Sequence, residues 1–224
     1  MADKSFPPVL SRKLNLQGIG DYYDLRRASN LRDEFCYQGI WVFTGGQGTG
    51  KTLNLIHTVR DLHKQYPKAL IVSNIPLFGL PYEIYHGIDD FNNIRNGIYG
   101  IIFVLDEIQT LYSLLKSANM DDSELFVWSQ NRKNRRVILG TSQRFTRIAK
   151  PIREQCAYHI ECKKRIFALH PYRIYDGYLY NDDGEYTGDR PPLHFYIPNV
   201  RSMLSYDTNF IVDPYAYEVG KRGR

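Results

Sequence analysis

The sequence IWVFTGGQGTGKT, residues 40–52, decides the fold of this chain. An apolar, β-prone run stops abruptly at a segment that holds four glycines and ends in a Lys-Thr pair. The segment meets the template Gly-x-x-x-x-Gly-Lys-[Ser/Thr] at Gly45, Gly50, Lys51 and Thr52. Apolar residues then recur at helical spacing, so a strand, a glycine-rich loop and a helix are expected in this order. This order indicates a phosphate-binding loop; the alternative is a glycine turn that only joins strand to helix.

The residue types of the loop fit the chemistry of a nucleoside triphosphate. Backbone N–H groups must surround the phosphate oxygens, which requires glycine where a Cβ would clash or where φ must be positive. Lys51 is expected to reach the β- and γ-phosphates of ATP, and the Thr52 hydroxyl to bind Mg²⁺. Replacement of Lys51 by alanine should therefore abolish hydrolysis. The predicted nucleotide-binding residues are Gly45, Gly46, Gln47, Gly48, Thr49, Gly50, Lys51 and Thr52.

Length and composition narrow the class of protein. With 224 residues, 43% of them hydrophobic, the chain suits one substantial α/β domain with additions. Its formal charge of +5 fits a polyanionic partner and fits a mere solubility surplus equally well. Three cysteines without a Cys-x-x-Cys pair favour neither a disulfide framework nor a thiolate zinc site. No run approaches the roughly 20 apolar residues of a membrane span, so a soluble, cytoplasmic protein is expected.

Further strands and helices alternate in the pattern of a parallel sheet with helical crossovers. Residues 101–105, IIFVL, form the unbroken apolar run of a central strand that is buried on both faces. The fold class is therefore α/β, with a mainly parallel central sheet flanked by helices. Other expected elements are strands at 69–73 and 137–140, helices at 89–95 and 121–134, and β-like segments at 158–161, 173–180 and 194–197.

Three parts are expected along the chain. Residues 1–38 are expected to form an N-terminal arm, and residues 39–165 the nucleotide-binding core. After Pro151 aromatic and β-prone residues become frequent, which predicts a β-rich extension over residues 166–224, packed on the core.

Polar residues follow two of the predicted strands. Asp106 and Glu107 come directly after residues 101–105; Asp106 is expected to hold Mg²⁺ and Glu107 to polarise the attacking water as general base. The alternative is a helix N-cap followed by a first-turn acid. Gln143 follows the third core strand, where an amide can sense a γ-phosphate, unless it is only a turn residue.

Arginines and lysines gather around the third core strand. Charge on a transferred phosphoryl group is commonly stabilised by a guanidinium from a neighbour, and Arg153 is preferred for this role, followed by Arg132. A solvated basic face is the alternative for either. The same region and Lys163-Lys164-Arg165 predict contact with DNA phosphates that does not depend on base sequence. The other candidate arginines are Arg135, Arg136, Arg144 and Arg147.

In the order of its motifs the chain resembles the FtsK/HerA group of DNA-translocating ATPases. That group includes viral genome-packaging ATPases and the zonular-occludens-toxin-like ATPases of filamentous phages. The resemblance implies a RecA-like P-loop core, a ring of identical subunits around double-stranded DNA, and ATP sites completed by a neighbour's arginine. The motifs that carry it are GGQGTGKT at 45–52, IIFVLDE at 101–107, WSQNRKNRR at 128–136 and ILGTSQRFTRIAKPIREQC at 138–156.

Within this resemblance, the leading expectation is a motor that packages viral double-stranded DNA into a preformed capsid. Its partners would be capsid or portal-vertex proteins, and its location the host cytoplasm or a virion vertex. Toxin-like members usually continue into a transmembrane segment, and this sequence shows none. Packaging is therefore preferred, and phage assembly and export is the second expectation. A phosphate-loop small-molecule kinase and a nucleotide-dependent interaction module without motor activity are the alternatives from other classes.

Overall fold

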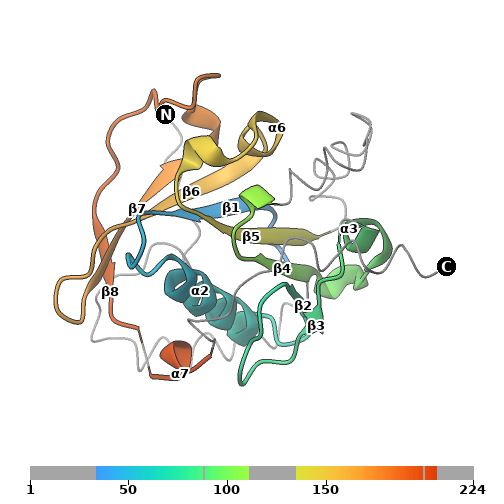
Figure 1. The fold of residues 1–224 in the computed structure, drawn as a ribbon. Helices are drawn as coiled ribbons and strands as arrows, with labels where there is room; N and C mark the ends of the chain where they lie inside the picture. The colour runs from blue at the N-terminus through green and yellow to red at the C-terminus, as the bar shows by residue number, and fades with distance from the viewer. Residues whose placement is uncertain (1–33, 88, 111–134, 199, 206–224) are drawn as a thin grey trace.

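The computed structural model describes residues 34–87, 89–110, 135–198 and 200–205, and these form one sheet with helices on both faces (Figure 1). The sheet has eight strands in the order β3-β2-β4-β5-β1-β6-β7-β8. The strands are β1 (Gly39–Thr44), β2 (Leu70–Ser73), β3 (Glu83–Ile84), β4 (Ile101–Leu105), β5 (Arg136–Ser142), β6 (Cys156–Cys162), β7 (His170–Asp176) and β8 (His194–Tyr196). The helices are α2 (Lys51–Gln65), α3 (Asp89–Asn93), α6 (Lys150–Arg153) and α7 (Val200–Met203), with short 3-10 turns η1 (Gly97–Tyr99), η2 (Phe145–Arg147) and η3 (Gly177–Leu179).

Strands β1 to β6 pair in parallel, whereas β7 and β8 are antiparallel to their neighbours. Every residue of β4 and β5 is buried, as expected for strands covered on both faces. The side chains of β1 alternate between the two faces of the sheet. Trp41 and Phe43 pack in the core cluster that includes residues of α2, and Ile40 and Val42 pack in the cluster that includes Ile152 of α6. Figure 1 shows α2 and α6 on these opposite faces.

The fold class predicted from the sequence is confirmed, and the expected core strands at 69–73, 101–105 and 137–140 appear as β2, β4 and β5. The helix expected around residues 89–95 appears as the shorter α3. Residues 1–33 of the expected N-terminal arm and the helix expected over 121–134 lie outside the described residues. The β-like segments expected at 158–161, 173–180 and 194–197 overlap β6, β7 and β8, which continue the core sheet. The boundaries of the three parts stay a prediction.

The carboxyl ends of the parallel strands form one edge of the sheet. Thr44, the last residue of β1, lies opposite Ser142, the last of β5, while β4 ends at Leu105, opposite Gly140. The residues that follow these three strands therefore emerge side by side. No helix among the described residues is long and apolar enough to cross a membrane.

Candidate nucleotide-binding site

The glycine-rich loop joins β1 to α2 at the carboxyl edge of the sheet, as predicted. Gly45, Gly48 and Gly50 have φ values of 146°, 74° and 81°, which explains why these positions are glycine. A Cβ on Gly45 would lie 2.4 Å from the carbonyl oxygen of Cys162, at the end of β6. The loop thus needs glycine both for its backbone shape and for its close packing against the neighbouring strand.

Hydrogen bonds within the loop hold it ready for an anion. Lys51 Nζ donates to the Gly46 carbonyl at 3.2 Å, and Thr49 Oγ1 donates to the same oxygen at 2.8 Å. Helix α2 begins here without a side-chain cap and without an acid in its first turn. Its first N–H groups and the positive end of its dipole therefore face the loop, an arrangement that favours a bound phosphate.

The two residues predicted to hold Mg²⁺ meet. Thr52 Oγ1 donates to Asp106 Oδ1 at 3.2 Å, across the space between the start of α2 and the end of β4. A hydroxyl and a carboxylate are oxygen ligands of the kind that Mg²⁺ takes, and this ion usually keeps several waters and binds substrate phosphates as well. Among the described residues, no group of three or more His, Cys, Asp or Glu side chains is arranged to hold a metal ion.

Thr141 of β5 organises both acids. Its Oγ1 donates to Asp106 Oδ1 at 2.6 Å and accepts the Glu107 N–H at 3.0 Å. Asn74, just beyond β2, holds Asp106 from the other side: its Oδ1 accepts the Asp106 N–H at 2.8 Å and its Nδ2 donates to the Asp106 carbonyl at 3.0 Å. Asp106 is therefore held from both strands that flank β4, at its carboxylate by Thr141 and at its backbone by Asn74.

Glu107 has a strained backbone. Its φ is 54°, in the left-handed region that a residue with a Cβ seldom adopts, at a cost of roughly 1–3 kcal/mol. The Glu107 carboxylate accepts a short hydrogen bond from Gln109 Nε2. Strain of this kind persists where the surroundings over-determine it, and here the bond from its N–H to Thr141 does so.

Gln143 and the arginines lie in different places. Gln143 is exposed beside the tip of β5, where Arg147 Nη1 donates to its Oε1 at 2.7 Å. Arg153 lies in α6, just before β6 begins opposite Ile40, near the amino end of the parallel strands. Its Nη2 donates to the Asp182 carbonyl at 3.3 Å, so within one subunit it is directed away from the loop. Arg132 lies outside the described residues.

Arg136, another candidate, has a structural place. It is 1% exposed, its Nη1 donates to the Phe91 carbonyl, and its guanidinium lies 5.7 Å from the centre of the Phe91 ring. Burial, and then the nearby charge of Arg95, lower its pKa to about 10. A buried guanidinium bonded to a carbonyl cannot reach a phosphate, so this residue ties α3 to the sheet.

A buried polar network lies behind the loop. Thr44 Oγ1, directly before Gly45, bonds to His159 Nε2 at 2.6 Å, and His159 Nδ1 bonds to the hydroxyl of Tyr180. Phe145 of η2 stacks on the imidazole, with 4.4 Å between ring centres. Desolvation by burial lowers the pKa of His159 to about 3, so the ring is neutral at physiological pH. The network links the end of β1 to the segment after β5 and to the C-terminal part of the sheet.

Thr141, Asn74 and His159 are residues of the site that were not predicted from the sequence. Thr141 and Asn74 follow the same rule as Asp106, since each ends or follows a predicted parallel strand. Their position at the end of a parallel strand is the signal that could have identified both residues. His159 gives no such signal, because it lies inside a strand whose neighbours cannot be read from the chain.

The chain is similar to several solved structures. The N-terminal domain of the zonular occludens toxin from Neisseria meningitidis matches with a TM-score of 0.56 and 13% identity, over 77% of this chain and 100% of that one. The genome-packaging NTPase B204 from Sulfolobus turreted icosahedral virus 2, in complex with AMP, matches with a TM-score of 0.46 and 14% identity, over 69% and 98%. The flagellar accessory protein FlaH from Methanocaldococcus jannaschii matches with 0.42 and 15%, over 66% and 82%.

At such low identity the likeness shows the fold alone. The chain has the RecA-like fold of P-loop NTPases, as the resemblance implied, and the match to the toxin domain supports this directly. No protein-family model and no curated protein sequence matches the chain.

Proposed function

We propose that the chain is an ATPase that hydrolyses ATP at the loop between β1 and α2 and uses the energy to move double-stranded DNA. The observation that carries the first half is the convergence of Thr52, Asp106 and Thr141 beside the loop lysine, through contacts of 3.2 and 2.6 Å. A glycine turn with a structural role alone would not need an acid fixed at this point.

Each residue has a definite task in the proposed reaction. Loop N–H groups and Lys51 bind the β- and γ-phosphates, replacing the bond of Lys51 to Gly46. Thr52 and Asp106 would hold Mg²⁺, which would supply positive charge against the negative charge that develops on the phosphates. Glu107 would take a proton from the attacking water; it follows Asp106 directly, just beyond the end of β4. Gln143 orients that water or senses the γ-phosphate.

The stabilising arginine is proposed to come from a neighbouring subunit. Arg153 lies near the amino ends of the parallel strands, whereas its own loop follows the carboxyl end of β1. It is partly exposed, near the surface segment that contains Asp182, and so it can face another copy. A ring of copies would bring this edge of one subunit toward the loop of the next, with Arg132 as the second candidate.

Work on DNA is supported by the basic sequence segments and by the motif order, including Gln143 followed by Ile152-Arg153. Among motors, packaging of viral double-stranded DNA into a capsid is preferred, with capsid or portal-vertex proteins as partners. Phage assembly in the manner of the toxin-like ATPases is the second candidate, and the likeness to the toxin domain favours it over a kinase on grounds of fold.

Phosphate release measured with and without long duplex DNA tests this proposal. We expect hydrolysis that depends on Mg²⁺, rises with duplex DNA of any base sequence, and disappears in Lys51→Ala. Glu107→Gln should bind ATP and hydrolyse it at least about 100-fold more slowly, within the range for general-base catalysis. Hydrolysis that ignores DNA would favour an interaction module or a kinase, and native turnover in Lys51→Ala would refute the site itself.

A further inference from the structure

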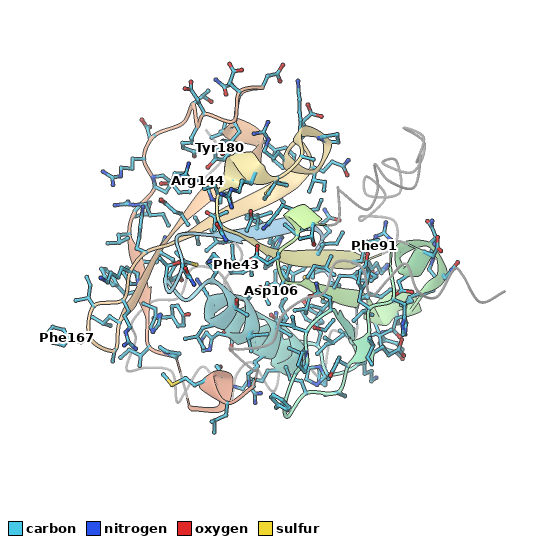
Figure 2. All side chains as sticks on the ribbon, viewed as in Figure 1. Phe43, Phe91, Asp106, Arg144, Phe167 and Tyr180 are labelled. Atoms are coloured by element: carbon cyan, nitrogen blue, oxygen red, sulfur yellow. The ribbon has the colours of Figure 1, made fainter. Side chains whose placement is uncertain are left out.

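The turn between β6 and β7 carries a basic and aromatic surface at the nucleotide edge of the sheet. Its sequence after Cys162 is KKRIFAL, residues 163–169. Ile166 and Leu169 exchange two backbone hydrogen bonds of 2.9 Å, so Phe167 and Ala168 form a tight turn. Phe167 is 95% exposed, and Figure 2 shows it far out at the tip of this hairpin.

The conformation of Phe167 is unusual. Its φ is 54°, so an aromatic residue occupies a left-handed turn position that glycine or asparagine normally fills. Neither burial nor packing explains the choice, because the ring contacts almost nothing of its own subunit. Strain at an exposed aromatic tip is the kind of outlier from which a binding role is inferred.

The charges beside the tip suit a polyanion. Lys163 forms an ion pair with Glu161 on β6, whereas Lys164 and Arg165 are exposed and have no acidic partner in the part of the chain that the structure describes. Ile166, 52% exposed, continues the apolar tip. Two exposed cations and an exposed aromatic residue therefore lie within four residues of one another at the tip of this hairpin.

The base of the hairpin touches the phosphate-binding loop on both of its strands. The carbonyl of Cys162, the last residue of β6, packs against Gly45, where a Cβ would approach it to 2.4 Å. His170, the first residue of β7, packs against Gly50, where a Cβ would lie 2.9 Å from its Nδ1. This buried nitrogen has no hydrogen-bond partner within the described residues. A shift of the loop on nucleotide binding would therefore press directly on the hairpin.

We propose that the β6–β7 turn is a duplex-DNA contact, with Lys164 and Arg165 on the phosphates and Phe167 in the groove, coupled to the nucleotide through Cys162 and His170. This inference rests on the proposed function. A two-stranded ribbon fits the roughly 12 Å width of the major groove, and phosphate contacts give binding that does not depend on base sequence. A second copy of the chain is the weaker occupant, because a stable interface buries about 800 Å² on each partner, more than a two-residue tip offers.

Two variants test the turn, and each addresses one feature. Lys164→Ala/Arg165→Ala removes both free cations. Phe167→Asn removes the ring but suits the left-handed φ, so it should fold at least as well as the native chain. The matched control is Lys64→Ala/Lys68→Ala, which loses the same charge at exposed positions near the far end of α2.

Two measurements compare the variants with the native chain. One is binding of fluorescent duplex DNA across a salt series, and the other is phosphate release with and without DNA. The double cation variant should bind at least about 10-fold more weakly, and the slope of log K against log salt should fall by about 2, whereas the control keeps the native slope. Phe167→Asn should reduce the DNA stimulation of phosphate release at saturating DNA.

The outcomes separate the two proposals. Native DNA affinity, salt slope and stimulation in both variants would overturn the turn contact while leaving the motor intact. A native chain that neither binds DNA nor responds to it would overturn the proposed function and the contact together. Loss of assembly by mass photometry in Phe167→Asn, with native DNA binding, would make the tip an interface between copies and also overturn the contact.

Discussion

Replacement of Thr141 by valine tests the organisation of the two acids. Valine keeps the shape of the buried, β-branched side chain in β5 and removes only the hydroxyl. Two interactions are lost: the 2.6 Å donation to the Asp106 carboxylate and the 3.0 Å bond from the Glu107 N–H. The backbone bond from the Ile108 N–H to the Thr141 carbonyl stays.

The magnitude follows from these two bonds. A hydrogen bond to a charged group contributes roughly 1.5–3 kcal/mol, and a buried N–H left without a partner costs roughly 1–3 kcal/mol. Both groups are only half-buried, so water recovers part of this, and a loss of about 3 kcal/mol is expected. For a chain of this size that corresponds to a Tm lower by about 6–12 °C.

Thr141→Ser is the matched control, because it keeps the hydroxyl and loses one methyl group, at a cost of about 1 kcal/mol. Urea unfolding and thermal melting of the three proteins measure the difference. Phosphate release should fall in Thr141→Val and be largely kept in Thr141→Ser, because Asp106 and Glu107 lose their common support only in the first. If the valine variant were as stable and as active as the serine variant, the hydroxyl would not organise this site.

Three further predictions address the strain, the loop and the buried imidazole. In Glu107→Asn the new side chain tolerates the φ of 54°, so the free energy of unfolding in urea should rise by up to about 1 kcal/mol while phosphate release is lost. A lower free energy of unfolding would show that the Glu107 backbone is not strained. Gly45→Ala should weaken binding of a fluorescent ATP analogue more than about 100-fold, since its Cβ meets the Cys162 backbone. Gly48→Ala, which has open space at φ 74°, should lower the free energy of binding by only roughly 1–2 kcal/mol. Equal losses of binding in the two variants would contradict the packing of Gly45 against Cys162. Because the pKa of His159 is lowered in the folded state to about 3, its contribution to stability is present above pH 6.5 and is lost as pH falls toward 3. Between pH 7.5 and 5.5 the unfolding free energy of the native chain should fall by about 1.4 kcal/mol more than that of His159→Gln, and parallel pH profiles would refute the assignment.

The sequence was sufficient for the core of the fold, because the strand at 101–105 and the loop at 45–52 combine strong periodicity with residues that one chemistry requires. The strand ends also predicted which polar groups would meet. Thr52 and Asp106 are far apart in the chain, yet their contact follows from the rule that parallel strands end at one edge.

The contacts that the sequence did not predict depend on pairing between distant segments. The contact of β6 with β1 places Cys162 against Gly45, and no local pattern encodes that neighbour. His159 and Tyr180 meet for the same reason, through the order of strands on the far side of β1. Arg136 looked like part of a basic surface because its neighbours in sequence are charged, but the register of β5 points it into the core. The partner of Arg153 in catalysis depends on another subunit and stays a prediction.

The central claim, that ATP hydrolysis at this loop moves duplex DNA, is tested most directly by displacement of a triplex-forming strand from a long duplex. The native protein should strip the third strand when ATP and Mg²⁺ are present, at any position along the duplex and for any flanking sequence. Glu107→Gln should bind the same DNA and ATP but leave the triplex in place. Hydrolysis of ATP on DNA without displacement, or displacement by Glu107→Gln at the native rate, would contradict the account.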